Sequence, residues 1–166
     1  MTDTKTNHNL AQAFARLSQA AARRKVYSRK ALREGRPGLA RFLRAMSASE
    51  AVQARRLFNS LIGRIDKSDT YLATIFEEEV QALLENYSKL IDTASVERPA
   101  LLHALSQLRA AATRLRSFYS SDNKDVKVNE DAGYFVCRFC GYLSLDRAPE
   151  KCPICGAPED AFHEIT

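Results

Sequence analysis

Two short stretches near the C-terminus decide the fold of this 166-residue chain: Cys137-Arg138-Phe139-Cys140-Gly141 and Cys152-Pro153-Ile154-Cys155-Gly156. Each has the form Cys-x-x-Cys-Gly, in which a tight turn brings two thiolates together. The glycine after the second cysteine lets the backbone fold round, so that N–H groups point at the sulfurs. Four thiolates form a tetrahedral site that suits zinc or a single iron. The spacing therefore predicts one iron or zinc ion per chain, with the ligands Cys137, Cys140, Cys152 and Cys155.

The size of the cysteine-bearing segment also calls for a metal. Residues 134–166 number only 33, and a domain below roughly 40 residues usually needs a metal, disulfides or a partner to stay folded. No run approaches the roughly 18 apolar residues that span a bilayer, and the first residues lack an apolar signal segment. We therefore expect a cytoplasmic protein without a membrane partner, in which reduced thiols bind metal rather than form disulfides.

Four runs upstream of the cysteines carry apolar side chains at helical spacing. They cover residues 9–34, 37–62, 69–93 and 99 to about 118. Gly35 and Gly63 follow the first two runs and are typical of helix C-terminal caps. Each run has a single apolar stripe, which predicts a four-helix bundle. Glu50 and Glu79 fall on the stripes of the second and third helices.

Charge divides the chain in the same place as the cysteines do. The net charge is +5, but residues 1–120 carry +9 and residues 121–166 carry −4. After the fourth helix a polar stretch loses helical periodicity and leads into β-type residues. We therefore predict three parts: a helical bundle over 1–120, a linker over 121–133, and a metal-bound β domain over 134–166.

The cysteine-bearing segment from Tyr134 to Pro158, together with Phe162, resembles the short rubredoxin-like domain at the C-terminus of rubrerythrins. The helical part is similar to the rubrerythrin ferritin-like bundle at Ala13-Phe14-Ala15, Ser18-Gln19-Ala20, Ala54-Arg55-Arg56-Leu57-Phe58, Tyr71-Leu72 through Tyr87, and Ser117-Phe118. The resemblance implies a mainly α fold, in which a ferritin-like four-helix bundle precedes a small rubredoxin-like or zinc-ribbon-like β domain.

Rubrerythrins as a family carry a di-iron site in the bundle, built from carboxylates on helices one and three and from ExxH pairs on helices two and four. At the matching positions of this chain only Glu50 and Glu79 keep a carboxylate. The other positions hold Leu17, Gln53, Ala82, Ala111 and Arg114. The two carboxylates of Glu50 and Glu79 cannot balance the positive charge of two iron ions, especially with the guanidinium of Arg114 nearby. We therefore expect no di-iron centre.

Arg114 suggests a replacement for the charge of the missing metal. If its side chain points inward, it pairs with the carboxylate of Glu50 or Glu79. The side-chain amide of Gln53 then donates hydrogen bonds to the carboxylate oxygens that Arg114 does not reach. The alternative leaves Arg114 at the bundle surface and the two glutamates partly solvated. The histidines do not restore a ligand set, because their positions are typical of surface or packing residues: His8, His103 and His163.

These observations favour an electron-transfer protein whose redox centre is one iron bound by the four cysteines, with an unknown redox partner. The alternative is a zinc-stabilised scaffold or interaction protein without a redox role. A third hypothesis is a di-iron peroxidase of the rubrerythrin type, but that chemistry belongs to the bundle site whose ligands are missing. No triad, phosphate-cradling loop or nucleotide motif is recognisable, so we assign no catalytic residue.

The connection between the second and third helices bears on assembly. Residues 63–68 span at most about 22 Å, whereas a helix of about 26 residues is roughly 39 Å long. The connection cannot run the length of the bundle, so the helices either alternate up and down or pack into a partner chain. The resemblance favours a domain-swapped homodimer.

The first two helices concentrate positive charge, with 14 Lys and Arg against three acidic residues over 1–64. This face is either solvated or a docking surface for an acidic object such as the cysteine-bearing domain. Nucleic acid is not expected as a partner, because no nucleic-acid-binding motif is present.

Overall fold

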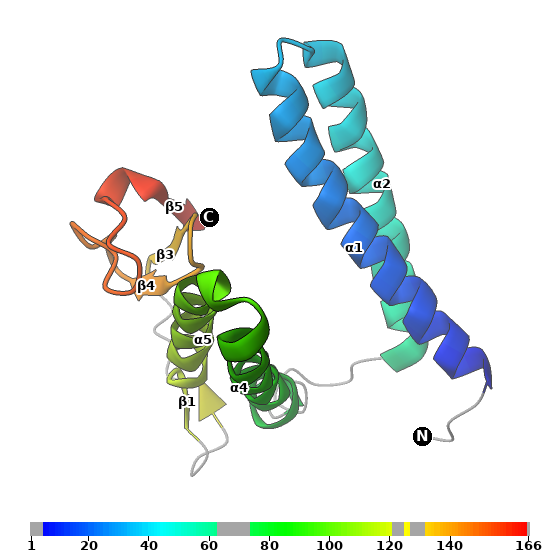
Figure 1. Cartoon of the computed structure of the whole chain (residues 1–166). Coiled ribbons are helices and arrows are strands. Elements are labelled where there is room, and N and C mark those ends of the chain that lie inside the picture. The colour runs from blue at the N-terminus through cyan, green and yellow to red at the C-terminus, as the bar shows by residue number, and fades with distance from the viewer. Residues whose placement is uncertain (1–4, 63–73, 121–124, 127–131, 166) are drawn as a thin grey trace. The chain divides into compact units, whose positions relative to one another are not determined.

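Residues 5–62, 74–120, 125–126 and 132–165 are described by the computed structural model (Figure 1). The chain divides into two compact units, Met1–Ile65 and Asp66–Thr166. The first contains two long helices, and the second contains two shorter helices and the strands that carry the cysteines. Over the described ranges the protein is mainly α-helical with a small antiparallel β domain near its C-terminus, which confirms the predicted fold class.

The first unit is a hairpin of helix α1 (Lys5–Arg33) and helix α2 (Pro37–Ile62), seen in Figure 1. Gly35 ends α1 with a φ of 69°, a conformation that glycine adopts without a Cβ clash. The backbone N–H groups of Gly35 and Arg36 donate to carbonyls of the last turn at 3.1 and 2.9 Å, as in a Schellman cap. The bounds of α2 confirm the prediction, whereas α1 begins four residues earlier than predicted.

Small side chains let α1 and α2 approach closely. Ala21 and Ala31 of α1 and Ala40 and Ala54 of α2 are buried. The hydroxyl of Ser47 donates to the backbone carbonyl of Ala21 at 2.8 Å and so joins the two helices directly. Because few large side chains stand between the helices, the edges of their contact remain open as grooves.

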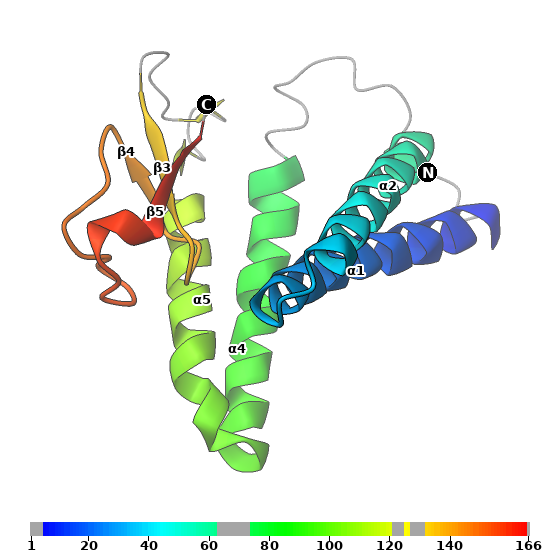
Figure 2. The ribbon, with the colours of Figure 1, turned by 90° about the horizontal axis from the view of Figure 1, so that it is seen from above.

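The second unit begins, in its described part, with the π-helical turn η1 (Thr74–Glu79), which continues into helix α4 (Val80–Glu97). Helix α5 (Leu102–Arg116) follows the short 3₁₀ turn η2 (Pro99–Leu101) and lies beside α4 (Figure 2). The proline at the start of η2 suits a first helical turn, as expected. Helix α4 extends four residues beyond the predicted end at residue 93, and residues 69–73 of that prediction lie outside the described residues.

A two-stranded ladder follows α5. Strand β1 (Tyr119–Ser120) pairs antiparallel with strand β2 (Asp125–Val126). The predicted linker over 121–133 is therefore paired at residues 125–126, while residues 121–124 and 127–131 lie outside the described part of the chain. The connection over 63–68, on which the assembly prediction depends, also lies outside it.

The cysteine-bearing domain is built on a three-stranded antiparallel sheet in the order β4-β3-β5. The strands are β3 (Tyr134–Cys137), β4 (Leu143–Leu145) and β5 (Phe162–Ile165), and the 3₁₀ turn η3 (Glu159–Ala161) leads into β5. Cys137 ends the central strand opposite Phe162 of β5. The sheet thus fixes one end of the first Cys-x-x-Cys turn. Among the described helices, none combines the length and the apolar composition needed to cross a membrane.

Candidate metal centre

Each Cys-x-x-Cys-Gly stretch folds into the tight turn that its sequence predicts. In the first turn the N–H of Gly141 donates to the carbonyl of Cys137 at 3.0 Å, and in the second Gly156 donates to Cys152 at 2.9 Å. Gly141 and Gly156 have φ values of 77° and 72°, in the left-handed region that glycine tolerates. The two turns therefore have matching geometry, and each presents two sulfurs on one side.

The four predicted ligands come together in space. The Sγ atoms of Cys137 and Cys155 lie 3.7 Å apart, and those of Cys140 and Cys152 lie 3.5 Å apart. All four sulfurs lie within 4.8 Å of one another, and all four cysteines are free thiols. A tetrahedron with metal–sulfur bonds of about 2.3 Å has sulfur–sulfur edges of about 3.8 Å. The donor set therefore fits one zinc or iron ion.

Burial and backbone donors act in opposite directions on these thiols. Burial raises the pKa of the Cys140 and Cys155 thiols above the ordinary value. Burial also acts to raise the pKa of Cys137, but the backbone N–H groups of Cys140 and Phe139, together with the thiols of Cys155 and Cys140, lower the pKa overall. A bound cation favours the thiolate form of every ligand, so metal binding and deprotonation are coupled.

Buried cysteines form much of the core of this small domain. Cys137, Cys140 and Cys152 are 1%, 4% and 2% exposed. Buried Ala157, Ala161 and Phe162 complete the cluster. Phe162 is the one large apolar side chain in the buried part of this core, and Phe135, Tyr142 and Ile154 pack against it while only partly buried. We therefore expect metal binding to add to the stability of the domain.

The side of the centre around Phe139 faces solvent. Phe139, between the two cysteines of the first turn, is 75% exposed, and Cys155 is the only partly exposed ligand of the four. An apolar ring is therefore exposed beside the ligand cluster, while the other three cysteines remain buried.

Arg114 joins helix α5 to the cysteine-bearing domain. Its Nε donates to the carbonyl of Leu143 in β4 at 3.3 Å, and its Nη1 donates to Ser117 Oγ at 3.3 Å. The guanidinium lies 4.3 Å from the ring centre of Phe118 and 5.9 Å from that of Tyr142. Its contacts are thus aromatic rings and a strand carbonyl, in place of the carboxylate partner considered from the sequence.

Within the first unit, Glu50 has a different cationic partner from the one expected. Its Oε1 lies 3.1 Å from Nη2 of Arg24, and the two side chains are only 15% and 28% exposed. Gln53 is exposed and donates to Ser49 Oγ at 3.2 Å. Leu17 is half-buried and has no ligand atom. Arg24 thus neutralises the carboxylate that the sequence analysis assigned to Arg114 or to a solvated position.

In the second unit the remaining positions lie on three elements. Glu79 is the exposed last residue of η1, Ala82 is exposed on α4, and Ala111 is buried on α5. Within this unit Glu79 and Arg114 have no ion pair over the described residues. Neither alanine can supply a ligand atom.

The three histidines each have a local hydrogen-bond partner. His8 and His103 lie 2.9 Å from the amides of Gln12 and Gln107, one turn further along their helices. His163 Nδ1 lies 2.9 Å from the carbonyl of Val136 across the sheet. These contacts fit the structural role expected for them.

Sequence reasoning missed two polar contacts. Arg24 lies three residues after Ala21 on the stripe of α1 that faces α2, and this spacing could have indicated its contact with Glu50. Tyr119 donates its hydroxyl to Glu77 Oε1 at 2.8 Å. This second contact spans 42 residues, and no local pattern signals it.

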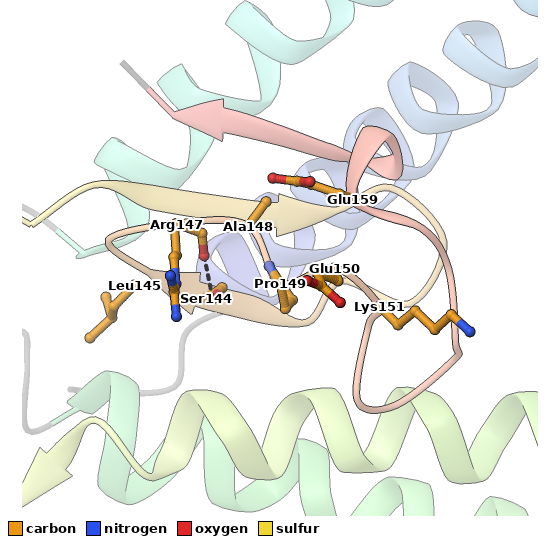
Figure 3. A pocket seen from close by; sticks show the side chains of 8 residues that line it. All are labelled: Ser144, Leu145, Arg147, Ala148, Pro149, Glu150, Lys151 and Glu159. Carbon is orange, nitrogen blue, oxygen red and sulfur yellow. Dashed lines mark hydrogen bonds between the residues drawn. The ribbon is translucent and has the colours of Figure 1, made fainter.

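A separate hollow of about 710 Å³ lies beside β4 (Figure 3). It is lined by side chains of both charges, including Arg147, Glu150, Lys151 and Glu159. The Ser144 hydroxyl closes the adjacent turn by donating to the carbonyl of Arg147 at 2.8 Å. None of the four cysteines lines this hollow, so it adds no ligand to the metal centre.

Comparison with known sequences agrees with this geometry. Residues 135–163 match the family model described as the rubrerythrin, rubredoxin-like domain. Rubrerythrin-2 of Clostridium acetobutylicum is 24% identical over 170 residues, covering 92% of each chain. Nigerythrin of Nitratidesulfovibrio vulgaris is 24% identical over 95% of this chain and 85% of its own length. Reverse rubrerythrin-1 of C. acetobutylicum is 53% identical, but over only 32 residues.

Solved structures resemble the whole chain as well. The mixed-valence and fully reduced structures of nigerythrin each match with a TM-score of 0.52 and 23% identity, covering 99% of this chain and 91% of theirs. The likeness supports a fold with a helical bundle followed by a rubredoxin-like domain. Taken with the clustered cysteines, these comparisons show that residues 135–163 match the rubrerythrin-type rubredoxin-like domain and that the chain is similar to rubrerythrins and nigerythrin along most of its length.

Proposed function

We propose that this protein transfers single electrons through one iron bound by its four cysteines. The observation that carries the proposal is the cluster of four free sulfurs at tetrahedral spacing in two matching turns. Iron bound by four thiolates supplies a one-electron redox couple. The nigerythrin structure described as all ferrous supports iron over zinc as the metal, because it belongs to a relative matching 99% of this chain.

The chain's own residues have four roles in this proposal. The turns hold the sulfurs in place, and the backbone N–H groups of Cys140 and Phe139 stabilise thiolate charge at Cys137. Buried Phe162 and the half-buried Tyr142, in edge contact at 6.5 Å between ring centres, keep water from the inner side. Exposed Phe139 provides the surface on which a redox partner docks.

We further propose that the bundle has lost the di-iron site. Leu17, Ala82 and Ala111 have no ligand atom, and the carboxylate of Glu50 already bonds to Arg24. Arg114 supplies no metal-ligand atom, and its guanidinium contacts the Phe118 ring and the Leu143 carbonyl. On this proposal the family's oxygen chemistry is absent, and the cysteine centre is the single metal site.

The assembly that we propose is a homodimer in which the hairpins of two chains are exchanged. The proposal rests on the sequence prediction that the third helix begins at residue 69. The six residues at 63–68 can then cross at most about 22 Å, whereas the 26 residues of α2 form about 39 Å of helix. A solution mass near 37 kDa, twice the chain mass of 18.6 kDa, is expected from light scattering. A mass of one chain would refute the dimer.

The electron-transfer proposal is tested on full-length protein produced in a medium that contains both iron and zinc. We expect a red protein with one iron per chain, whose visible absorption bleaches with dithionite and returns on reoxidation. Protein loaded with zinc alone is the matched control, and it should be colourless with the same far-UV circular dichroism. Exclusive uptake of zinc would overturn the proposal in favour of a zinc-stabilised scaffold, and so would an iron form that cannot be reduced reversibly.

A further inference from the structure

The first unit carries positive charge that its own carboxylates do not neutralise. Residues 5–62 hold 13 Lys and Arg side chains, and their only carboxylates are Glu34 and Glu50. Glu50 bonds to Arg24 at 3.1 Å, and Glu34 lies 3.8 Å from Lys30. The other cations of this hairpin therefore have no carboxylate partner within it.

Four of these cations line one edge of the contact between α1 and α2. Two hollows of about 460 and 410 Å³ adjoin at Ala51, which lines both. Small side chains such as Ser18 and Ala48 form much of their lining, and no carboxylate is among the described lining residues. We call the joined hollows the basic groove; its cations are Lys25, Arg29, Arg44 and Arg55.

The cations run along both sides of the basic groove. On α1, Lys25 and Arg29 are one turn apart, a rise of about 6 Å. On α2, Arg44 and Arg55 are separated by 11 residues, three turns and about 16 Å. A line of positive charge with this extent matches a linear polyanion better than a single anion. Arginine also presents a planar fork of donors that suits phosphate oxygens.

Two aromatic rings lie at one end of the basic groove. Phe14 of α1 and Phe58 of α2 have ring centres 5.2 Å apart and line the hollow that also contains Arg55. Both rings are only partly buried, so part of each remains open to the groove. Nucleic acid was not expected from the sequence, in which Phe14 and Phe58 stand 44 residues apart. Folding of the hairpin brings them together.

The basic groove is lined by residues of α1 and α2 alone, and none of these is a cysteine ligand or a position that matches the rubrerythrin di-iron site. None of Leu17, Glu50 and Gln53, which match the di-iron positions of the first two helices, lines it. A function of the groove therefore does not require the metal or the lost ligands.

We propose that the basic groove binds single-stranded nucleic acid. Its cations contact successive phosphates, and bases stack on Phe14 and Phe58, the combination by which proteins bind single strands without sequence preference. An acidic protein segment would match the charge but would not use the rings. The presence of both features favours a nucleic-acid strand.

The test measures binding of full-length, metal-loaded protein to a fluorescein-labelled oligothymidylate of about 20 nucleotides by fluorescence anisotropy. Four phosphate contacts on a single strand give a slope of about −3 in log K against log salt. The association constant should then fall roughly 50-fold between about 50 and 200 mM salt. The triple variant Lys25→Gln, Arg29→Gln, Arg44→Gln should fall only about threefold over the same range, since one contact remains.

A matched control removes the same charge from elsewhere on the hairpin. The variant Arg16→Gln, Arg23→Gln, Arg41→Gln changes three exposed residues outside the groove and should keep the wild-type salt dependence. Phe58→Leu should weaken binding roughly tenfold at fixed salt without changing the slope, because stacking is not ionic. Circular dichroism confirms that each variant remains helical.

Three outcomes would overturn the proposal. Equal losses in the two triple variants would mean that net charge alone attracts the strand. Displacement of the strand by polyglutamate as readily as by unlabelled oligothymidylate would assign the groove to an acidic protein segment. Absence of binding at the lowest salt would mean that the groove has no such ligand.

Discussion

Arg114 contacts aromatic rings and a backbone carbonyl rather than a carboxylate. It stands where the rubrerythrin pattern, by resemblance, has a histidine ligand, and its guanidinium lies over Phe118 and donates to the carbonyl of Leu143. Tyr142, the second ring beside it, accepts the N–H of Cys137 through its backbone carbonyl at 3.0 Å. Arg114 therefore holds the cysteine-bearing domain against α5. It does so through Tyr142 and Leu143, of which Tyr142 is hydrogen-bonded to the ligand Cys137.

Replacement of Arg114 by Gln should loosen this contact. The hydrogen bond and the cation–π contact together contribute about 1–2 kcal/mol, so the melting temperature of zinc-loaded protein should fall by roughly 5 °C or more. Arg109→Gln, at an exposed site on the same helix, is the control and should leave the temperature unchanged. Equal melting of all three proteins would show that Arg114 does not hold the domain.

The four cysteines are the residues that sequence predicted best, because covalent spacing fixes their geometry within each turn. The partners of Arg114 could not be predicted in the same way. They depend on where β4 lies against α5, and no periodic pattern encodes that placement. Arg24 is an intermediate case. The sequence places it on the apolar stripe of α1, but its pairing with Glu50 depends on how α1 aligns with α2, which the sequence does not predict.

At the scale of elements, both units contain polar contacts between segments distant in sequence. Between α1 and α2, Ser47 donates to the carbonyl of Ala21, and Arg24 pairs with Glu50, whose Oε2 is enclosed, like the Nε of Arg24, without a hydrogen-bond partner among the described residues. In the second unit the hydroxyl of Tyr119 in β1 joins Glu77 in η1, and the Tyr119 ring stacks on Phe76 at 5.1 Å. Such contacts fix how α1 aligns with α2 and how β1 aligns with η1, in places where few large apolar side chains pack between the elements.

Loss of the carboxylate at Glu50 should destabilise the first hairpin. Glu50→Ala leaves Arg24 enclosed without its partner, at a cost of about 1–3 kcal/mol in urea unfolding. The double variant Arg24→Met, Glu50→Leu should recover most of that loss, because apolar side chains replace a partly buried pair well. Glu34→Ala, which removes the exposed pair with Lys30, is the control and should have no measurable effect. A Glu50→Ala protein as stable as the wild type would contradict the role of the pair.

Tyr119 should make stability depend on alkaline pH. Its pKa is raised by burial first and then by the hydrogen bond and charge of Glu77, against an opposing effect of Arg116. The folded protein therefore favours the neutral phenol. This contribution is complete below the ordinary pKa near 10 and is lost as the pH rises through the higher native pKa.

Thermal unfolding between pH 8 and 11 measures this effect, over a window of about three pH units around the tyrosine pKa. Tyr119→Phe should melt below the wild type at neutral pH, because Glu77 loses its donor, and the difference should shrink as the pH rises. Tyr87→Phe on α4 is the control and should show no such convergence. A constant gap between Tyr119→Phe and the wild type would exclude the phenol as the titrating group.

At the scale of the whole molecule, length, charge and cysteine placement predicted a helical body and a separate metal-bound tail. The helices could be predicted because a capping glycine such as Gly35 and the spacing of apolar residues act within a few residues of the chain. The π-helical turn η1 could not be predicted, because it contacts Tyr119 of β1, more than 40 residues further along the chain. The groove along α1 and α2 was also hidden, because Phe14 and Phe58 meet only in the folded hairpin.

Metal removal should unfold one part of the molecule and spare the other. The core of the cysteine-bearing domain consists largely of its ligands, so a chelator that strips the ion should abolish the dispersed amide signals of β3, β4 and β5. Far-UV circular dichroism from the helices should persist. Retention of the strand signals in metal-free protein would show that the domain folds without its ion.

Metal stoichiometry tests the central claim most directly, namely that the four cysteines form the single metal site of the chain. Elemental analysis of full-length protein, purified from a medium supplied with iron and zinc, should give one metal per chain. Glu50→Ala should retain that value, whereas Cys140→Ser should lose the metal. Two or three metals per chain, with the excess lost in Glu50→Ala, would show that the bundle still binds a di-iron centre and would contradict the account.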